Sequence, residues 1–275
     1  MIVVRISGGL GNQMFQYAFA RALQTRGNRV YMHWHPHHSK SEHNGFELDR
    51  VFQTQLSDTT PLLSQSLLKR WQAWQLRKTA RKREVHELKF QAHLLETQAG
   101  YLDGYWQTEQ YFESIRDKIC TGFDLKPLTG SKNLELQEQI TQSESCSIHI
   151  RRGDYVGHPE LGSICDQAYY NNALKELDTR HPHCLLVVFS DDIEFSKDLL
   201  QGRTQVQFCD WNRGRDSWMD MALMCRCKHH IIANSSFSWW GAWLSNKKGT
   251  VLAPKKWSRK YTQAQNECPR EWLRI

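Results

Sequence analysis

Short apolar runs alternate with longer segments of helical periodicity along the chain. Ile2–Ile6 is an apolar run that predicts a strand, and a glycine-rich turn follows it at residues 7–11. Apolar residues then recur every three or four positions up to Gly27, which is typical of a helix that ends at a glycine. Val30–Trp34 predicts a second strand. This order favours an α/β domain with a mostly parallel sheet.

The next segment is less regular. Residues 46–100 indicate mostly helix, Tyr101–Trp106 a return to the sheet, and Thr108–Cys120 a further helix. Gly122–Lys132, which has a proline and a glycine in its interior, is the best linker candidate.

The alternation is cleaner after the linker. Strands are predicted over Ser145–Ile150, Cys184–Phe189, Gln205–Cys209, His230–Ala233 and Thr250–Ala253, and helices over Asp166–Leu177, Asp216–Cys227 and Ser236–Ser245. The simplest architecture is two Rossmann-like domains facing across a cleft. We expect them at 1–125 and 131–255, with a tail over 256–275 that packs back on the N-terminal domain.

The net charge of +7 is concentrated in one segment. Lys69–Arg83 carries seven basic residues and no acidic one, which equals the whole excess. With Trp71, Trp74 and Leu76 interleaved, this segment suits either peripheral contact with an anionic membrane or a solvated helix face. Nucleic-acid binding is not favoured, because one basic patch without a base-reading motif is weak evidence.

The cysteines and the N-terminus favour a cytoplasmic protein, peripheral to the inner face of the membrane if the basic segment binds lipid. Eight cysteines are scattered without a C-x-x-C pair, which suggests reduced thiols. The chain starts with a strand and not with a secretory signal. The longest aliphatic run, Cys184–Phe189, is far shorter than the roughly 18 apolar residues that suggest a spanning helix.

Two groups of residues have the chemistry of metal ligands. They are His33, His35, His37 and His38 in the first group, and Cys225, Cys227, His229 and His230 in the second. The first is better explained as a polar loop around Pro36, and the second as singly buried residues at a helix–strand junction. The chain has no D-x-D pair, so negative charge on a pyrophosphate would have to be met by Arg, Lys or backbone N–H groups.

The segment around residue 150 carries the strongest chemical signal. A strand ends near His149 and brings Arg151 and Arg152 to its carboxyl end, where α/β sheets open their ligand crevices. An arginine fork matches a phosphate bidentately. A pair between an arginine and Asp154 that only stabilises a turn is the structural alternative.

Two further segments complete the set. A strand runs into a helix that begins with Ser235, Ser236 and Phe237, where free N–H groups and the helix dipole suit a phosphate, besides ordinary capping by serine. Asp191 and Asp192 follow the most aliphatic strand, where they can orient arginines, contact a ribose or cap the next helix.

Four blocks resemble the α1,2-fucosyltransferases of glycosyltransferase family 11. They are SGGLGNQMFQYA at 7–18, HIRRGDY at 149–155, FSDD at 189–192 and NSSFSWWGAW at 234–243. They follow the family's order from residue 6 to about 254. The H-x-R-R-x-D core is shared with α1,6- and protein O-fucosyltransferases, whereas the first and last blocks narrow the resemblance to the α1,2 group. The chain resembles the bacterial members, which build O-antigen or similar glycans in the cytoplasm.

The resemblance implies a GT-B fold with an acceptor-side N-terminal domain and a C-terminal domain that binds GDP-fucose. It implies inverting transfer of L-fucose to the 2-hydroxyl of a galactose-terminated glycan, without a metal or cofactor. Asp220 would pair with guanine N1–H and N2–H, although such an acid is also common on helix surfaces. The donor-binding residues would be Asn12, His149, Arg151, Arg152, Asp191, Asp192, Asp220, Ser235, Ser236 and Phe237.

For catalysis we expect Arg151 to meet the negative charge that builds on the departing GDP. Asp154 and Glu160 are the candidates for the base that deprotonates the acceptor, and a weak base is sufficient if GDP departure is advanced. Two alternatives stay open at this point: a fucosyltransferase of another linkage, and a non-catalytic protein that binds a GDP-sugar or a glycan.

Overall fold

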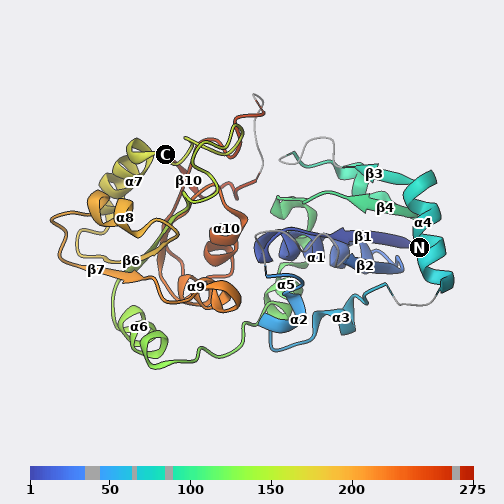
Figure 1. Cartoon of the computed structure of the whole chain (residues 1–275), viewed down its shortest axis with the longest axis horizontal. Helices are drawn as coiled ribbons and strands as arrows, with labels where there is room; N and C mark the ends of the chain where they lie inside the picture. The colour runs from blue at the N-terminus through green and yellow to red at the C-terminus, as the bar shows by residue number, and fades with distance from the viewer. Residues whose placement is uncertain (35–43, 64–66, 84–88, 262–266) are drawn as a thin grey trace. The chain divides into compact units, whose positions relative to one another are not determined.

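The computed structural model describes residues 1–34, 44–63, 67–83, 89–261 and 267–275. The chain divides into two compact units, 1–126 and 127–275, each built on a parallel sheet (Figure 1). The boundary falls inside the predicted linker Gly122–Lys132. Each unit is described by itself below, and the cleft between them stays a prediction.

The first unit has a four-stranded parallel sheet in the order β2-β1-β4-β3. Its strands are β1 (Ile2–Ile6), β2 (Val30–Trp34), β3 (Arg81–Arg83) and β4 (Gly100–Asp103). Helix α1 (Leu10–Thr25) connects β1 to β2 and buries a continuous row of apolar side chains that includes Met14, Phe15 and Phe19. The sequence pattern therefore predicts these first three elements correctly.

The rest of the first unit consists of shorter elements than the sequence predicts. Its helices are α2 (Leu48–Val51), α3 (Leu56–Thr59), α4 (Leu67–Thr79), η2 (Ala92–Glu96), η3 (Glu109–Tyr111), η4 (Glu113–Ile115) and α5 (Arg116–Gly122). The expected mostly helical segment 46–100 thus contains strand β3 as well. The single helix expected over 108–120 is wrong, because the Thr108 side chain starts a 3₁₀ turn by accepting from the Gln110 N–H. Tyr111, Phe112 and Ile115 are all buried along the short helices η3 and η4.

The second unit has a six-stranded parallel sheet in the order β10-β9-β8-β5-β6-β7. Its strands are β5 (Ser145–Ile150), β6 (Leu185–Ser190), β7 (Val206–Cys209), β8 (His229–Ile231), β9 (Val251–Ala253) and β10 (Leu273–Arg274). Numbered within the unit and read from β7, this order is 3-2-1-4-5-6, that of a dinucleotide-binding Rossmann fold. The Rossmann-like sheet expected here is therefore confirmed.

One helix precedes the second sheet and the others lie between its strands. They are α6 (Ser131–Gln142), α7 (Gln167–Arg180), α8 (Ile193–Leu199), η5 (Gly214–Asp216), α9 (Trp218–Met224) and α10 (Ser236–Trp243). Helix α6 begins inside the predicted linker and was not expected. Helices α9 and α10 approach so closely that a Cβ built on Gly241 would lie 2.9 Å from the Met224 Cβ, so any side chain at Gly241 would push the helices apart.

The described part of the C-terminal tail belongs to the second unit, and the expected packing of the tail on the N-terminal domain stays a prediction. Strand β10 pairs with β9, with Leu273 opposite Leu252. The Trp239 indole N–H of α10 donates to the Glu267 carbonyl oxygen at 2.6 Å and its ring lies 5.5 Å from that of Trp272. These aromatic contacts hold the tail against α10.

A search of the described residues finds no helix that is both long enough and apolar enough to cross a membrane.

Candidate active site

The strand order of the second sheet reverses between β5 and β8. In open α/β sheets, ligands bind outside the carboxyl ends of the strands at such a switch point. Strand β5 ends at Ile150 and leads directly into Arg151, and the segment after β8 leads into Ser235 at the start of α10. The fold therefore brings the two strongest sequence motifs to the same edge of one sheet.

Arg151 is held between two carboxylates. One terminal nitrogen lies 2.7 Å from Asp154 Oδ1, and the other lies 2.9 Å from Asp191 Oδ2. The guanidinium carbon also lies 5.7 Å from the centre of the Tyr155 ring. With its side chain 33% exposed, Arg151 is oriented by protein groups and still open to a ligand.

Asp191 connects both arginines. Besides contacting Arg151, it accepts a hydrogen bond from the Arg152 backbone N–H at 2.8 Å. This contact is close: a Cβ on Gly153 would lie 3.0 Å from Asp191 Oδ2. The glycine of the H-x-R-R-G-D sequence is therefore needed for the carboxylate to reach beneath the loop.

The Arg152 guanidinium faces a separate carboxylate. Its Nε donates to Asp192 Oδ2 at 3.0 Å, and its central carbon lies 3.9 Å from the centre of the Phe195 ring. Asp192 is also the N-cap of α8, accepting from the Phe195 N–H. This backbone hydrogen bond, together with Arg152, lowers the pKa of Asp192. Two of its three expected roles, orienting an arginine and capping a helix, are thus observed.

His149 is buried below this edge as a neutral imidazole. Burial lowers its pKa to about 4, and the positive charge of Arg151 acts in the same direction. Its Nδ1 is buried and has no hydrogen-bond partner within the part of the chain that the structure describes. The ring centre lies 5.9 Å from that of Phe237 on α10. His149 therefore offers an unused nitrogen next to the helix that the phosphate-binding prediction selects.

The start of α10 is capped and well anchored. The Ser235 side chain accepts from the Phe237 N–H at 3.3 Å, which confirms the expected N-cap. The preceding Asn234 is buried, and its amide donates to the carbonyl oxygens of Leu161 and Trp257. The Tyr155 hydroxyl donates to the Asn234 carbonyl oxygen at 3.3 Å, which links the arginine loop to the serine segment. Ser236, the first residue of α10, is half-buried.

Asp220 lies on α9 beside the end of β7. Its Oδ1 accepts from the Asn212 amide at 2.8 Å and from the Cys209 thiol at 3.2 Å. Burial raises the pKa of Asp220 to about 7, although these two hydrogen bonds oppose the shift. Asn212 is fixed in turn by a reciprocal amide pair with Asn133 of α6. Asp220 is thus a rigidly held carboxylate that titrates near neutral pH, and not a helix-surface acid.

The sequence of the whole chain agrees with these motifs. Residues 1–275 match the profile of glycosyl transferase family 11. The chain belongs to this family.

Three relatives and one solved structure illustrate the similarity of this family 11 member to known proteins. An Escherichia coli α1,2-colitosyltransferase is 32% identical, over 100% of this chain and 99% of the relative. The E. coli O-antigen biosynthesis glycosyltransferase WbnK is 28% identical, over 92% and 93%. The mouse galactoside 2-α-L-fucosyltransferase Sec1 is 27% identical, over 92% and 67%. The crystal structure of NodZ, an α1,6-fucosyltransferase from Bradyrhizobium, soaked with GDP-fucose, has a TM-score of 0.55 at 15% identity, over 88% and 91%. The expected GT-B fold is confirmed.

The two candidate bases of this family 11 protein differ in their surroundings. Asp154 is engaged by Arg151 at 2.7 Å and is 37% exposed. Glu160 is exposed in the loop before α7, and the Arg259 N–H donates to its backbone carbonyl oxygen. The Asp154 carboxylate is thus occupied by Arg151, whereas Glu160 is exposed to solvent; the role of either residue as the base stays a prediction.

Asn12 lies in the first unit, and its contact with the donor stays a prediction. It sits in the first turn of α1, where its side-chain oxygen accepts from the Gln107 amide at 2.8 Å. Gly8 has a φ of +76°, and a Cβ there would lie 2.7 Å from the Asn12 amide nitrogen. The glycine turn therefore serves first to let the backbone pass close to Asn12.

Several residues of the site were not predicted. Tyr155 belongs to the HIRRGDY block, and no local sequence motif marks Cys209, Asn212 or Phe195 as site residues. The polar run after β7, which contains Asn212, was the available signal, since polar residues at the carboxyl end of a parallel strand often line a site.

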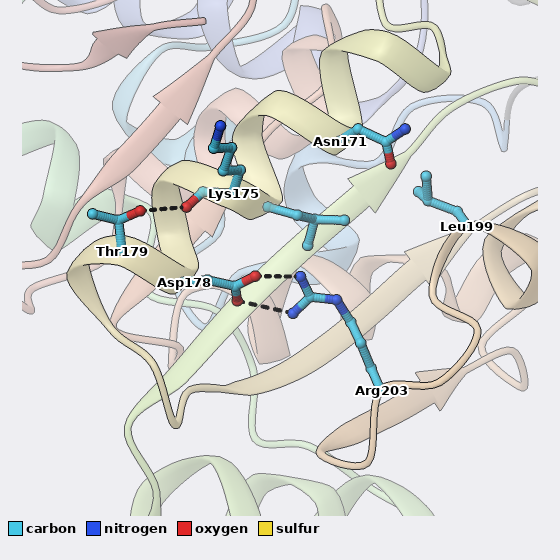
Figure 2. Close-up of a pocket in the computed structure, with 7 residues that line it drawn as sticks. Asn171, Lys175, Asp178, Thr179, Leu199 and Arg203 are labelled. Atoms are coloured by element: carbon cyan, nitrogen blue, oxygen red, sulfur yellow. Dashed lines mark hydrogen bonds and ion pairs between the residues drawn. The ribbon is translucent and has the colours of Figure 1, made fainter.

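The hollow in Figure 2 lies on the outer side of α7, away from these residues. It encloses about 420 Å³ and is lined by Asn171, Leu174, Lys175, Asp178, Thr179, Leu199 and Arg203. Arg203 and Asp178 form a two-point ion pair across it at 2.9 and 2.5 Å. The hollow contains none of the predicted site residues, and its most polar groups already satisfy one another.

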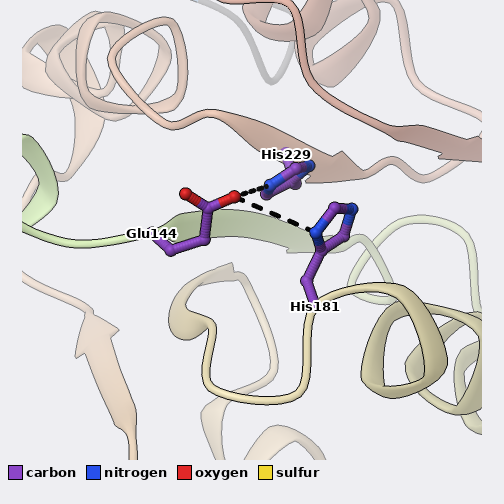
Figure 3. Close-up of side chains that lie close together, drawn as sticks. All are labelled: Glu144, His181 and His229. Atoms are coloured by element: carbon purple, nitrogen blue, oxygen red, sulfur yellow. Dashed lines mark hydrogen bonds and ion pairs between the residues drawn. The ribbon is translucent and has the colours of Figure 1, made fainter.

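One cluster in the described residues has metal-ligand chemistry, Glu144, His181 and His229 (Figure 3). It lies at the amino end of the second sheet, opposite the arginines. Lys228 donates to both Glu144 oxygens at 2.8 and 2.9 Å, and His229 Nε2 lies 2.7 Å from one of them. Lys228 and His229 together lower the pKa of Glu144 to about 2.

The hydrogen bonds of this cluster do not suit a metal. The Thr250 N–H donates to His229 Nδ1 at 2.9 Å, which leaves the proton of the neutral ring on Nε2, facing Glu144. A cation there would have to displace both this proton and the Lys228 ammonium. The cluster is therefore better explained as an ion-pair network. Of the earlier metal candidates, His33 bonds to Tyr101, and His35, His37 and His38 lie outside the described residues.

Proposed function

We propose that this protein transfers L-fucose from GDP-fucose to the 2-hydroxyl of a terminal β-galactoside, with inversion and without a metal, in the synthesis of O-antigen or a related glycan. The observation that carries the proposal is Arg151, held by Asp154 and Asp191 at the switch point beside the serine-capped start of α10.

The proposed catalysis rests on electrostatics. As fucose leaves through an oxocarbenium-like state, negative charge builds on the pyrophosphate, and groups that are already oriented stabilise that charge without reorganisation. Arg151 is fixed at both terminal nitrogens in advance, and the first N–H groups of α10 provide a second positive end. In this proposal Arg151, Ser235, Ser236 and Phe237 contact the phosphates.

In this proposal the guanine base is recognised farther along the same edge of the sheet, near the end of β7. Asp220 accepts guanine N1–H and N2–H through Oδ2, since Oδ1 is occupied by Asn212 and Cys209. Adenine presents an acceptor at N1 and no exocyclic N2–H, so the same carboxylate would reject it. In this assignment His149 and Asn12 contact the nucleoside and the donor, Arg152, Asp191 and Asp192 hold the arginine loop, and Glu160 is the acceptor base ahead of Asp154.

A second candidate donor is GDP-colitose. It is favoured by the 32% identity to an α1,2-colitosyltransferase over essentially both full lengths. Colitose is L-fucose without its 3-hydroxyl group, so both donors would share the GDP contacts proposed above. Only the pocket that holds the donor sugar would distinguish GDP-fucose from GDP-colitose.

The test is GDP release from GDP-fucose and from GDP-colitose, each with a panel of galactosides that includes lactose. Linkage analysis of the product then identifies the hydroxyl that is modified. We expect acceptor-dependent GDP release and a new α1,2 linkage. Saturable GDP-sugar binding without GDP release from any acceptor would instead show a binding protein, and a different linkage would overturn the assigned regiochemistry.

A further inference from the structure

Helix α4 presents two tryptophans to solvent. Its Ala73, which is 3% exposed, forms a core cluster with Val3 of β1 and Tyr101 of β4, and Leu76 packs against this cluster. Trp71 and Trp74 are 53% and 56% exposed. The other tryptophans of the chain are buried or half-buried. Because exposing a large indole costs hydrophobic free energy, two neighbouring exposed indoles indicate a contact surface.

The two indoles belong to one helical face. Positions 71, 74 and 78 are three and four residues apart, so their side chains form a stripe opposite the buried Ala73 and the half-buried Leu76. Lys78 continues this stripe, with its ammonium 5.5 Å from the centre of the Trp74 ring.

Cations flank the stripe without compensation. Arg70, Arg77 and Lys78 have no carboxylate partner in the described ranges, and no acidic residue occurs from 69 to 83. Two neighbouring cations do have partners within the protein: Arg81 pairs with Asp103, and Lys69 lies over the Tyr31 ring. The remaining positive charge on α4 is therefore available to an external anion.

We propose that this face of α4, formed by Arg70, Trp71, Trp74, Arg77 and Lys78, binds the surface of an anionic phospholipid bilayer. Indoles prefer the headgroup region, where the ring is apolar and the N–H remains hydrated, and basic side chains pair there with lipid phosphates. Charge complementarity selects this partner over a second copy of the chain, which would bring one cationic face against another. A single basic segment without a base-reading motif does not favour a nucleic acid as the partner.

The orientation follows from the helix geometry. A 13-residue helix is about 20 Å long, too short to span a bilayer but sufficient to lie in its interface. The buried side of α4 stays on its own sheet, so binding requires no unfolding of the domain.

The test uses the whole protein and sedimentation with vesicles of phosphatidylcholine, with or without phosphatidylglycerol. We expect binding to the anionic vesicles that weakens as salt is added. The triple variant Arg70→Gln, Arg77→Gln and Lys78→Gln should bind roughly a hundredfold more weakly, about fivefold for each cation. The matched control replaces Lys118, Lys175 and Lys248, which are exposed and scattered over the two units, by glutamine and should retain most of the binding.

Insertion of the indoles is tested separately with brominated lipids, which quench tryptophan fluorescence on contact. Because only two of the eleven tryptophans are exposed, the wild type should show partial quenching, and this quenched fraction should be nearly lost in the Trp71→Gln, Trp74→Gln variant. Three results would overturn the proposal: equal binding to neutral and anionic vesicles, an equal loss in the scattered-lysine control, or binding to RNA at salt concentrations that abolish vesicle binding.

Discussion

Replacing Asp220 by asparagine should stabilise the protein while it destroys nucleotide binding. The asparagine side-chain oxygen can keep the hydrogen bonds from Asn212 and Cys209, because both reach the single oxygen Oδ1. The amide group then replaces Oδ2, where it would meet the guanine N–H donors with donors of its own. The substitution therefore removes a buried charge and blocks the proposed base contact in one step.

The magnitude follows from the pKa of Asp220, which burial raises from 3.8 to about 7. The folded state holds this proton more tightly than the unfolded state, so its stabilising effect is full below pH 3.8 and is lost as the pH rises to about 7. The difference corresponds to about 4 kcal/mol at 1.36 kcal/mol per pKa unit. Asparagine imitates the protonated acid at every pH. The free energy of unfolding of the Asp220→Asn variant, relative to wild type, should therefore grow by about 2.5 kcal/mol between about pH 5 and about pH 8.

The assay is urea unfolding of wild type and Asp220→Asn at both pH values, followed by tryptophan fluorescence, with GDP binding measured by calorimetry on the same samples. Wild-type GDP affinity should fall on acidification through pH 7, since only the ionised carboxylate accepts both guanine protons. A variant that is less stable than wild type near pH 8, or that still binds GDP normally, would refute the reasoning.

Four further outcomes are expected. Arg151→Ala should lower transfer about 100- to 1,000-fold with unchanged thermal unfolding, whereas Arg203→Ala, on the outer side of α7, should leave the rate unchanged. Gly153→Ala should displace the Asp191 carboxylate, 3.0 Å from the new Cβ, and lower kcat/KM about tenfold or more. Glu144→Gln should be less stable than wild type above pH 4.5, and the urea midpoints of the two should converge as the pH falls towards 2, through the lowered pKa of Glu144. A chelator of divalent ions should leave the initial rate of transfer unchanged.

The sequence predicts the elements that its own local pattern determines. Strands β5 and β6 are buried on both faces, so their apolar runs can be recognised in the sequence together with the strand ends that lead into the site. The apolar patterns of β1 and α1 can be recognised in the same way. Helix α6 was missed because the first of its buried positions, Asn133, Leu136 and Ile140, is polar. The helical periodicity is present, but Asn133 is buried because its side chain hydrogen-bonds to Trp211 and Asn212. These partners are distant in sequence, so no local pattern reveals them.

The candidate site divides in the same way. The arginines and the serine cap follow from residues adjacent to strand ends, so their convergence could be predicted from an α/β topology alone. The environment of Asp220 could not, because its burial depends on Cys209 and Asn212, which lie on a different segment, and that segment depends on α6. The destination of the tail was likewise decided by non-local contacts, those of Trp239 with Glu267 and Trp272.

Gly241 has a consequence for attempts to change the donor. Helix α9 carries Asp220 and helix α10 begins with the serine cap, and the two helices meet where Gly241 has no side chain. In the proposed assignment, this close packing would set the separation between the nucleobase and its phosphates. Redesign for a nucleotide of different length would have to rebuild this helix junction, whereas exchange of the sugar alone can leave it untouched.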